Sequence, residues 1–589
     1  MSKQPTFKYV PGKDPELDAY VTNFLTENHL DYIAFLDKVA PPEQVRFMVA
    51  LKDDEFYYPC SDRMFECLVF GNDPEYVRHR YQQVKERIDQ LISERISDPF
   101  RRRFFRALIH YKFKHETADN LMMPSRVEKR LYKIFMDKSQ IRDPYFQRKG
   151  RLNQTALDLV SAAPFESTLN FIDPADWSSF TNLDQLKLEL DLIKLGRLIA
   201  LSVADMEQIK SISDQPTAAD IQALFDIPAK GRGLEMLSKY LVQHSKKKAG
   251  GATIPLKILY LANESGEIIF DLAVMNHLTS MGHIVAMALK KGPTFTKAAF
   301  SDVYQDSIIR EATADFLVIR DSKLTRNSVA PLFRGGQKHI IFSDGTHEDL
   351  NFKLTSVTFA RIFKEVDLVI SKGPEQLRRI TETHFTFTQD IINFTRDAEG
   401  RLLAGFKAKS PDVVKFDSED LAARAYRIID QMRQAKRDKK RVIFYSGIIG
   451  SIPGQIDVAK KIMTVFVTHL ASRLDNTFII DPSQYFEPGM DADDLMHMWE
   501  IVQRSGLIDI WRFQSHEDIE ESFSLLNQKV PYEWAGKDST FSTGCTKEMN
   551  IALDVQKKNQ EMQIIGPPLD RFLRRSEYGV GKLHDIRLP

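Results

Sequence analysis

The chain has 589 residues, a length at which one hydrophobic core usually gives way to two or three domains. Hydrophobic residues make up 43% and charged residues 28%, a composition that excludes a disordered chain. The 81 Lys plus Arg balance the 81 Asp plus Glu, so the net charge gives no reason to expect nucleic acid or a membrane as partner. Three cysteines and the lack of an apolar run of about 18 residues lead us to expect a cytoplasmic protein without disulfides or transmembrane helices.

The first part of the chain is predicted to be helical. Residues 73–96 and 183–203 space their apolar side chains three and four apart, with charged residues between them, as amphipathic helices do. A basic, Gly-containing stretch from Gln243 to Pro255 then interrupts this pattern and is typical of a linker or a flexible loop. We therefore predict a helical N-terminal region over residues 1–245.

Short apolar runs alternate with helix-length segments from residue 250 onward. Such runs are typical of parallel strands that are buried on both faces of a sheet. We predict an α/β domain over residues 250–430, with a central, mostly parallel sheet and helices on both faces. The predicted strands lie at residues 256–262, 283–290, 314–320, 339–344 and 366–372.

The last region, residues 438–589, follows a charged helix that is predicted at residues 418–440. Four apolar runs indicate further strands between helices, and they form either a second α/β unit or an extension of the first sheet. The sequence favours neither arrangement. Cys545 stands at the start of a predicted helix, where it is either a small packing residue or a nucleophile with a lowered pKa.

A cluster of polar residues ends the first predicted strand. Asn263 and Glu264 come directly after "KILYLA", and Gly266 allows the backbone to approach a ligand closely. Adjacent oxygen donors beyond the carboxyl end of a strand suit a hard cation such as magnesium or manganese. An ordinary strand-to-helix turn, capped by Ser265 or Asn263, explains the same residues. Only the neighbouring motifs can separate the two interpretations.

Three other stretches carry charges that could belong to the same site. Asp302 and Asp306 are four residues apart, so in one helix they would share a face. Lys372 and Gly373 form a sharp turn after a strand, where a lysine can neutralise a phosphate, and Lys409 follows another apolar run. A solvated acidic face and ordinary surface turns are the alternatives.

Taken in order, these stretches resemble the damage-control phosphatase family. In "DPYFQRKGRLN" the chain matches the family's Asp-Pro-Tyr, Lys and Asn, with Asp143 expected to cap a helix that begins at Pro144. "LNFID", with Asn170 and Asp173, is similar to a following Asn and Ile-Asp. "NESGEIIFD", "KGPTFTKAAFSDV", "SDGT", "VDLVISKGPEQ" and "KSP" resemble five later motifs in the right order. The resemblance covers about residues 50–430.

The resemblance implies metal-dependent hydrolysis of a small phosphorylated metabolite. A divalent metal (Mn, Mg, Ni or Co) would lie between Asn263, Glu264 and Asp302 and activate a water molecule. Glu267 would orient or deprotonate that water, and Lys372 would neutralise the phosphate charge. The other residues that would bind phosphate are Gly373, Lys409 and Ser343.

Two positions depart from the family pattern. The family presents Asp and then Asn where this chain has Asn263 and then Glu264, and Gln376 stands where an Asn follows the Lys-Gly turn. The longer Glu side chain moves its carboxylate, and rates that depend on positioning are sensitive to such a shift. The alternatives are therefore a metal-dependent phosphatase and a non-catalytic relative that binds metal or phosphometabolite. A third is a nucleotide- or phosphate-binding transferase in residues 438–589, where "SGIIGSIPGQ" is a Gly-containing loop after a strand.

Overall fold

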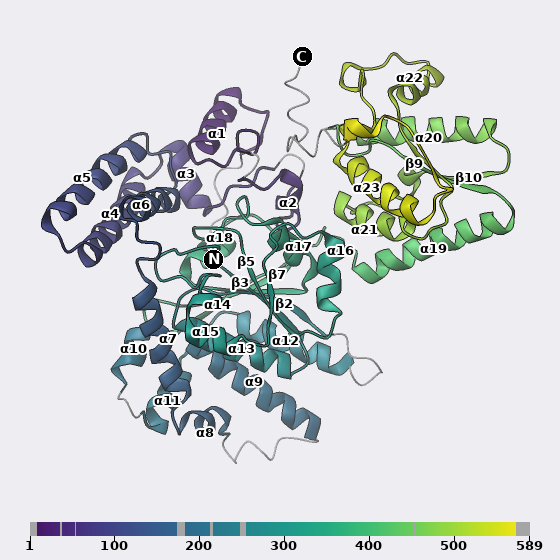
Figure 1. Cartoon of the computed structure of the whole chain (residues 1–589). Coiled ribbons are helices and arrows are strands. Elements are labelled where there is room, and N and C mark those ends of the chain that lie inside the picture. Colours follow the sequence, from purple (N-terminus) through teal and green to yellow (C-terminus); the bar gives the residue numbers. More distant parts are fainter. Residues whose placement is uncertain are drawn as a thin grey trace. The chain divides into compact units, whose positions relative to one another are not determined.

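The computed structural model describes residues 9–35, 38–52, 55–172, 183–212, 216–247, 255–452 and 454–572. The chain forms two compact units, Met1–Val413 and Val414–Pro589, which are considered separately below (Figure 1). The predicted region 1–245 and most of the predicted region 250–430 fall in the first unit, and the predicted region 438–589 lies within the second. Within the described ranges, every helix is too short or too polar to span a bilayer.

An eight-stranded sheet lies at the centre of the first unit. Its strand order is β1-β8-β7-β6-β2-β3-β5-β4, and all neighbours are parallel except the antiparallel pair β7 and β8. The mostly parallel α/β fold is thus confirmed. The strands are β1 (Ala229–Lys230), β2 (Lys257–Leu261), β3 (Ile284–Leu289), β4 (Leu317–Ile319), β5 (His339–Ser343), β6 (Leu368–Lys372), β7 (Asp390–Arg396) and β8 (Leu402–Lys407).

Both faces of this sheet are buried. Leu259 and Leu261 of β2 belong to one hydrophobic core. Ile258 and Tyr260, which alternate with them along the strand, belong to another. Alternate side chains of a strand point to opposite faces, so each face has a core of its own. Continuous apolar strands are what this arrangement requires, and the predicted strands match β2 to β6.

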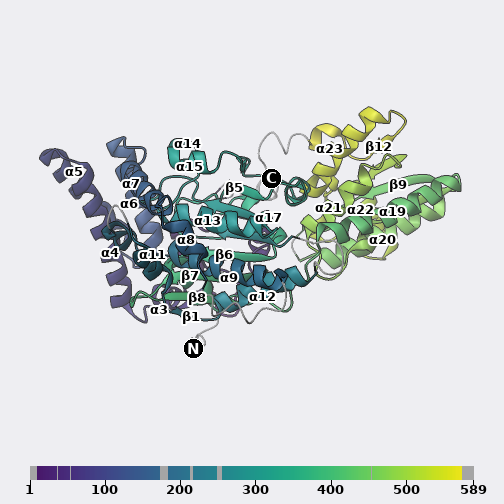
Figure 2. The same ribbon diagram turned by 90° about the horizontal axis from the view of Figure 1, so that it is seen from below.

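One face is covered by N-terminal helices together with α17, and Figures 1 and 2 show α4, α5 and α6 side by side. The predicted helix at residues 73–96 is confirmed as α4, where the Asp73 side chain accepts a hydrogen bond from the Tyr76 N–H and Pro74 occupies the first turn. The helices on this side are α1 (Pro15–Glu27), α2 (Pro42–Arg46), α3 (Asp62–Phe70), α4 (Pro74–Arg95), α5 (Pro99–Glu116), α6 (Pro124–Ser139), α17 (Val357–Glu365) and α18 (Pro374–Thr381).

The other face is covered by α9, α12 and α13, which can be followed in Figure 2. Helix α13 is apolar on most of its surface because it lies between the sheet and α9. The remaining helical segments of the first unit are α7 (Phe146–Val160), α8 (Phe165–Asn170), α9 (Leu183–Ser202), α10 (Met206–Ser211), α11 (Ala218–Phe225), α12 (Gly233–Lys247), α13 (Glu267–Ser280), α14 (Asp302–Gln305), α15 (Ser307–Ala312), α16 (Arg326–Val329) and η3 (Ala330–Phe333).

The strand order reverses at β2. The chain runs from β2 to β3 on one side and later returns to place β6 on the other side of β2. In open parallel sheets ligands bind beyond the carboxyl ends of the strands at such a reversal. The relevant loops are therefore those that follow Leu261 and Lys372.

The second unit has its own four-stranded sheet, so it is a second α/β unit and not an extension of the first. The strand order is β10-β9-β11-β12, with all neighbours parallel. The strands are β9 (Arg441–Ser446), β10 (Thr477–Ile480), β11 (Ile510–Phe513) and β12 (Gln563–Ile565). The helical segments are α19 (Ser418–Arg437), α20 (Ile456–Arg473), η4 (Pro482–Tyr485), α21 (Ala492–Gln503), α22 (His516–Leu525), η5 (Tyr532–Trp534), η6 (Ser539–Phe541) and α23 (Thr543–Lys558).

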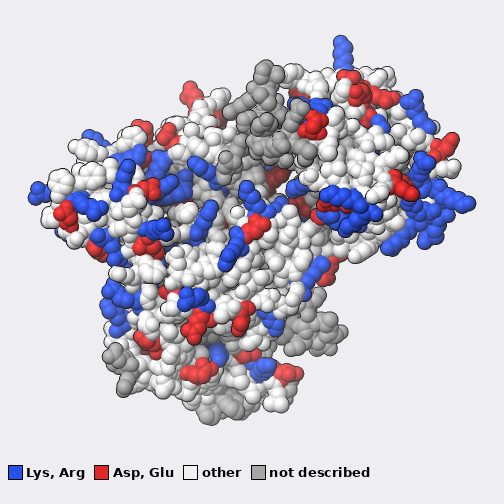
Figure 3. All heavy atoms as spheres, in the orientation of Figure 1, with Lys and Arg blue, Asp and Glu red and all other residues white. Residues whose placement is uncertain are grey.

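Over most of the face drawn in Figure 3, Lys and Arg side chains lie among Asp and Glu side chains, whereas Lys and Arg predominate at the right-hand end of the view.

Candidate functional site

The loops after β2 and β6 touch each other. Gly373 has a φ of 91°, a left-handed conformation that glycine adopts without strain. A Cβ atom built on Gly373 would lie 2.8 Å from Asn263 Nδ2, so a side chain at this position would force Asn263 to shift. The structure therefore brings together Asn263 and the Lys-Gly turn, which are more than one hundred residues apart in the sequence.

Lys297 reaches into the loop after β2. Its Nζ donates to Asn263 Oδ1 at 2.6 Å and lies 2.8 Å from Glu264 Oε1. The backbone holds it there, because Ser265 N donates to Thr296 O at 2.8 Å and Ala298 N donates to Asn263 O at 3.0 Å. Burial lowers the pKa of the Lys297 ammonium, but the carboxylate of Glu264 outweighs burial and holds that pKa above its ordinary value.

Lys372 is fully buried at the end of β6. Its Nζ donates to Asp271 Oδ1 at 2.7 Å and to Glu267 Oε2 at 2.9 Å, and Tyr260 also donates to Asp271 Oδ1 at 2.7 Å. Burial raises the pKa of Asp271 to about 6, and the Lys372 ammonium opposes that shift. The structure thus places Lys372 and Glu267 together, with the lysine charge directed at two carboxylates of α13.

The "DPYFQRKGRLN" stretch lies against the same loops. Lys149 Nζ donates to both oxygens of Asp302, at 2.7 and 2.9 Å, and is 2.8 Å from Asp143 Oδ2. Asn153 Oδ1 accepts a hydrogen bond of 2.6 Å from Gly266 N, and Asn153 Nδ2 donates to Asp306 Oδ2 at 2.9 Å. Three motifs that are distant in the sequence therefore meet around the loop after β2.

Two details of local structure differ from expectation. Asp143 does not cap α7: the helix begins at Phe146 with Tyr145 at its N-cap, and Asp143 Oδ1 instead accepts a hydrogen bond from Tyr145 N. Asp302 and Asp306 do not share a helix face, because α14 ends at Gln305 and Asp306 caps the next helix, α15. In both places a short polar side chain bonds to nearby backbone N–H groups and ends or delays the helix.

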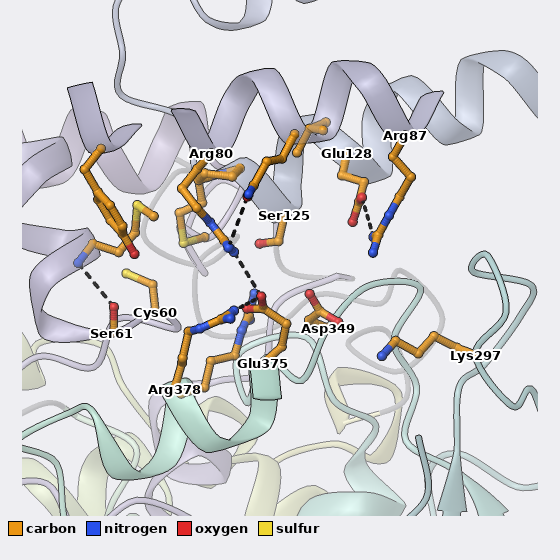
Figure 4. A pocket seen from close by; sticks show the side chains of 17 residues that line it. Cys60, Ser61, Arg80, Arg87, Ser125, Glu128, Lys297, Asp349, Glu375 and Arg378 are labelled. Carbon is orange, nitrogen blue, oxygen red and sulfur yellow. Dashed lines mark hydrogen bonds and ion pairs between the residues drawn. The ribbon is translucent and has the colours of Figure 1, made fainter. Parts of the chain in front are cut away.

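A cavity of about 340 Å³ lies beside Lys297, lined by α4, the start of α6, the turn at Asp349 and the start of α18 (Figure 4). Arg80 Nη2 lies 2.9 Å from Glu375 Oε1, and Arg378 is bonded to the same carboxylate oxygen. The lining holds five cationic and three acidic side chains, an excess of two positive charges. They are Arg80, Arg87, Lys297, Arg378 and Arg379, with Glu128, Asp349 and Glu375.

A second cavity of about 250 Å³ shares five lining residues with the first, namely Arg87, Ser125, Glu128, Lys297 and Asp349. Glu264 lines it, and aromatic side chains form part of its wall, namely Tyr132, Tyr145 and Phe295. Burial raises the pKa of Asp349, but Lys297 and Arg379 outweigh it and hold that pKa below its ordinary value. Lys297 is thus the residue that joins the loop after β2 to both cavities.

None of the residues predicted to bind phosphate, namely Lys372, Gly373, Lys409 and Ser343, lines either cavity. Ser343 ends β5 and its hydroxyl accepts a hydrogen bond of 3.1 Å from Gly345 N, outside the linings of both cavities. Lys409 follows β8, which runs antiparallel to β7, and its N–H donates to Asp390 Oδ1 at the start of β7 at 3.0 Å. The amino ends of the parallel strands β6 and β7 are adjacent. Lys409 therefore lies at the amino ends of these strands, whereas Lys372 lies at the carboxyl end of β6.

One further stretch of the predicted motif set, "LNFID", can be placed only in part. Asn170 ends α8 and its side chain donates to Glu166 O at 2.9 Å, which satisfies a helix carbonyl. Asp173 lies outside the described residues.

The sequence arguments did not identify several residues that line the cavity. Lys297 lies inside the quoted stretch "KGPTFTKAAFSDV", and Arg378 and Arg379 come one residue after "VDLVISKGPEQ". Arg80 and Arg87 are seven residues apart on α4, a spacing that places them on one face of the helix. A search for cations at helical spacing could have found that pair, whereas Asp349 carries no local signal.

The residues expected to bind a divalent metal do not fit one as they are arranged. Lys297 is bonded to Asn263 and Glu264, and Lys149 is bonded to Asp302, so lysine ammonium groups already engage all three oxygen-bearing side chains. In the parts of the chain that the structure describes, no three His, Cys, Asp or Glu side chains are grouped so that they could hold a metal ion.

In the second unit, the structure answers the question that Cys545 raised. The side chain is buried and its Sγ lies 3.3 Å from Gly447 O, to which the thiol can donate. Burial raises the pKa of the Cys545 thiol far above its ordinary value, so the helix N-terminus does not create a thiolate there. Cys545 is a packing residue.

Comparisons with known proteins add a family. The profile of the damage-control phosphatase ARMT1-like domain matches residues 71–424. Among solved structures, a DUF89 family protein from Pyrococcus horikoshii matches with 13% sequence identity and a TM-score of 0.38, over 56% of this chain and 98% of that chain. A comparison with curated protein sequences gave no match.

Proposed function

Because the chain belongs to the damage-control phosphatase ARMT1-like family, we propose that the cavity beside Lys297 binds the phosphate group of a small phosphorylated metabolite. The family acts on small phosphorylated metabolites and is generally metal-dependent. The proposal concerns the ligand class and the place where it binds.

The charge of the cavity lining carries this proposal. Five cationic side chains face three acidic ones in a space of about 340 Å³. A phosphate monoester carries nearly two negative charges at neutral pH and is attracted to a lining in which cations outnumber carboxylates. Arginine binds phosphate with two parallel hydrogen bonds, and a cavity of this size is typical of small-molecule sites.

The position of the cavity supports the same ligand. Lys297 contacts the loop after β2, and Glu375 lies in the first turn of α18, directly after β6. The cavity therefore lies next to the reversal in strand order, beyond the carboxyl ends of two central strands.

Calorimetric titration of the full chain with glucose 6-phosphate and with glucose tests the proposal. We expect the phosphorylated sugar alone to bind, and Arg80→Ala to weaken it about tenfold, because a charged hydrogen bond is lost. Arg103→Ala, on the exposed face of α5, is the matched control and should leave binding unchanged. Equal binding of the two sugars, or unchanged binding by Arg80→Ala, would contradict the proposal.

Hydrolysis of the bound metabolite is the second candidate function, and the contact between Glu267 and Lys372 favours it. The Glu267 side chain is 16% exposed and its Oε2 is held at 2.9 Å by Lys372 Nζ, so it could orient or deprotonate a water molecule while the lysine fixes its position. Release of phosphate from p-nitrophenyl phosphate and sugar phosphates, with and without Mn, Mg, Ni or Co, tests it. Turnover that Glu267→Gln abolishes without changing ligand affinity would support this role.

A further inference from the structure

We propose that the Lys297 ammonium takes the place of a divalent cation at the carboxyl end of β2, so that phosphate binds in the adjoining cavity without a metal ion. This inference rests on the proposed function, and it assigns Lys297 as the residue that determines metal independence.

The contacts of Lys297 are those that a cation at this place would make. Its Nζ lies 2.6 Å from Asn263 Oδ1 and 2.8 Å from Glu264 Oε1, the amide and carboxylate oxygens that follow β2. Oxygen donors of this kind are the ligands that hard divalent cations prefer. A lysine ammonium has three N–H donors, so these two contacts leave one for a ligand oxygen.

The backbone around Lys297 fixes the ammonium in this position. Glu264 and Lys297 form an antiparallel bridge, which is flanked by the hydrogen bonds from Ser265 N to Thr296 O and from Ala298 N to Asn263 O. The Lys297 side chain is only 18% exposed. A side chain held by its backbone on both sides, and bonded at its tip, cannot leave the oxygen donors at little cost.

The third expected metal ligand, Asp302, is also bonded to a lysine. Asp302 accepts hydrogen bonds of 2.7 and 2.9 Å from Lys149 Nζ, and both side chains are almost completely buried. Each oxygen-bearing side chain expected to bind metal is therefore bonded to an ammonium group. A metal ion would have to displace two lysines, and it would bring two positive charges close to both of them.

Lys297 also faces the space where a phosphate would bind. It lines both cavities, together with Arg87 and Asp349, and Figure 4 shows its side chain extending toward Asp349. One residue thus joins the oxygen donors of the loop to the cationic lining. In this arrangement Lys297 supplies one positive charge, and the arginines of α4 and α18 supply the rest.

Titration of the EDTA-dialysed full chain with Mn²⁺, followed by electron paramagnetic resonance, tests the inference directly. We expect no saturable site in the wild-type protein up to about 1 mM free Mn²⁺, a Kd range in which binding is weak. Lys297→Ala should create a site with one Mn²⁺ per chain, since Asn263 and Glu264 lose their lysine. Lys291→Ala, an exposed lysine nearby, is the matched control and should behave like the wild type.

Titration with inorganic phosphate supplies the second measurement. Phosphate affinity of the wild-type protein should be the same with and without EDTA, and Lys297→Ala should lower it about tenfold in EDTA. One equivalent of Mn²⁺ bound tightly by the wild type, or phosphate binding that EDTA abolishes, would overturn the inference. Both wild-type measurements remain decisive if the variant fails to fold. If phosphate binds under neither condition, the proposed function fails, while the Mn²⁺ titration still tests the lysine.

Discussion

At the scale of single residues, Lys372 lies at the carboxyl end of a strand, but its charge pairs with carboxylates inside the protein. Its ammonium is completely buried and bonded to Asp271 and Glu267, and Tyr260 donates to the same Asp271 oxygen. Burying a charge is costly unless it is paired and hydrogen-bonded, and here the ammonium is bonded to two carboxylates. The lysine therefore has a structural role, whatever it contributes to ligand binding.

Lys372→Met should destabilise the protein strongly. The substitution leaves the Asp271 carboxylate buried without its counter-ion, and breaking a buried pair in this way costs about 3–5 kcal/mol. Urea denaturation followed by circular dichroism measures the change in the free energy of unfolding. Lys239→Met is the control, because Lys239 pairs with Glu235 on the surface, where such pairs contribute about 0–1 kcal/mol. Equal stability of the two variants would show that the buried pair does not form.

His384 makes stability depend on pH. Its Nδ1 lies 3.0 Å from Asp62 Oδ1 and its Nε2 lies 3.3 Å from Glu55 Oε1. Burial lowers the pKa of His384, but the hydrogen bonds to Asp62 and Glu55 outweigh burial and raise that pKa to about 9. The folded value exceeds the unfolded one, so the stabilisation is fully present below about pH 6.5 and is lost as the pH rises through 9.

We therefore expect the free energy of unfolding to fall by up to about 3 kcal/mol between pH 6.5 and 9, at 1.36 kcal/mol per pKa unit. Urea denaturation at several pH values measures the slope. His384→Gln should remove most of it, whereas His110→Gln, on the exposed face of α5, should leave it intact. A slope that persists in His384→Gln would assign the pH dependence to other groups.

At the scale of elements, the Lys-Gly turn between β6 and α18 depends on two properties of Gly373. Its φ of 91° is left-handed, and its missing side chain makes room for Asn263. Gly400 has a φ of 80° but no neighbour within 4 Å of a built Cβ atom, so it shares only the first property.

Gly373→Ala should consequently cost more stability than Gly400→Ala. Left-handed backbone costs an alanine roughly 1–2 kcal/mol at either position, and at Gly373 the contact with Asn263 adds to it. Gly373→Ala should also weaken the binding of glucose 6-phosphate, because Asn263 and Lys297 must shift. Urea denaturation and calorimetric titration of both variants give the two readouts. Equal losses of stability would mean that the turn can move away from Asn263.

The elements also show where sequence reasoning succeeds and where it stops. The strands β2 to β6 were predictable because they are continuous apolar runs that end in turn residues. Strand β7 was missed, since Asn393 and Thr395 interrupt its apolar pattern even though both are buried. Asn393 Nδ2 donates a hydrogen bond of 2.9 Å to Ser371 Oγ on the neighbouring strand, and no local sequence pattern records such a partner.

The direction of β8 was equally hidden. Strand periodicity is the same for parallel and antiparallel neighbours, so the apolar run before Lys409 gave no indication that β8 turns back along β7. Because β8 runs in this direction, Lys409 lies at the end of the sheet away from Lys372.

At the scale of the whole molecule, the order of motifs in the sequence was a better guide than any one motif. Asn263 meets the turn at Gly373, and the "DPYFQRKGRLN" stretch is bonded to Gly266 through Asn153 and to Asp302 through Lys149. The partners of these residues could not be foreseen, because side-chain pairing across a fold depends on distances that the sequence does not contain. Lys297 and Lys149 lay within the quoted stretches, but nothing local marked them as counter-ions of the expected metal ligands.

The make-up of the cavity wall bears on how this protein can be divided. The segment 250–430, predicted from the sequence as an α/β domain, supplies Lys297, Asp349 and the start of α18, while Arg80, Arg87, Ser125 and Glu128 come from α4 and the start of α6. A fragment made of that segment alone would lack the part of the cavity wall that α4 and α6 supply. The cationic residues that remain would then be exposed to water. Any recombinant fragment intended for ligand screening must therefore begin upstream of Cys60, the first residue that lines the hollow.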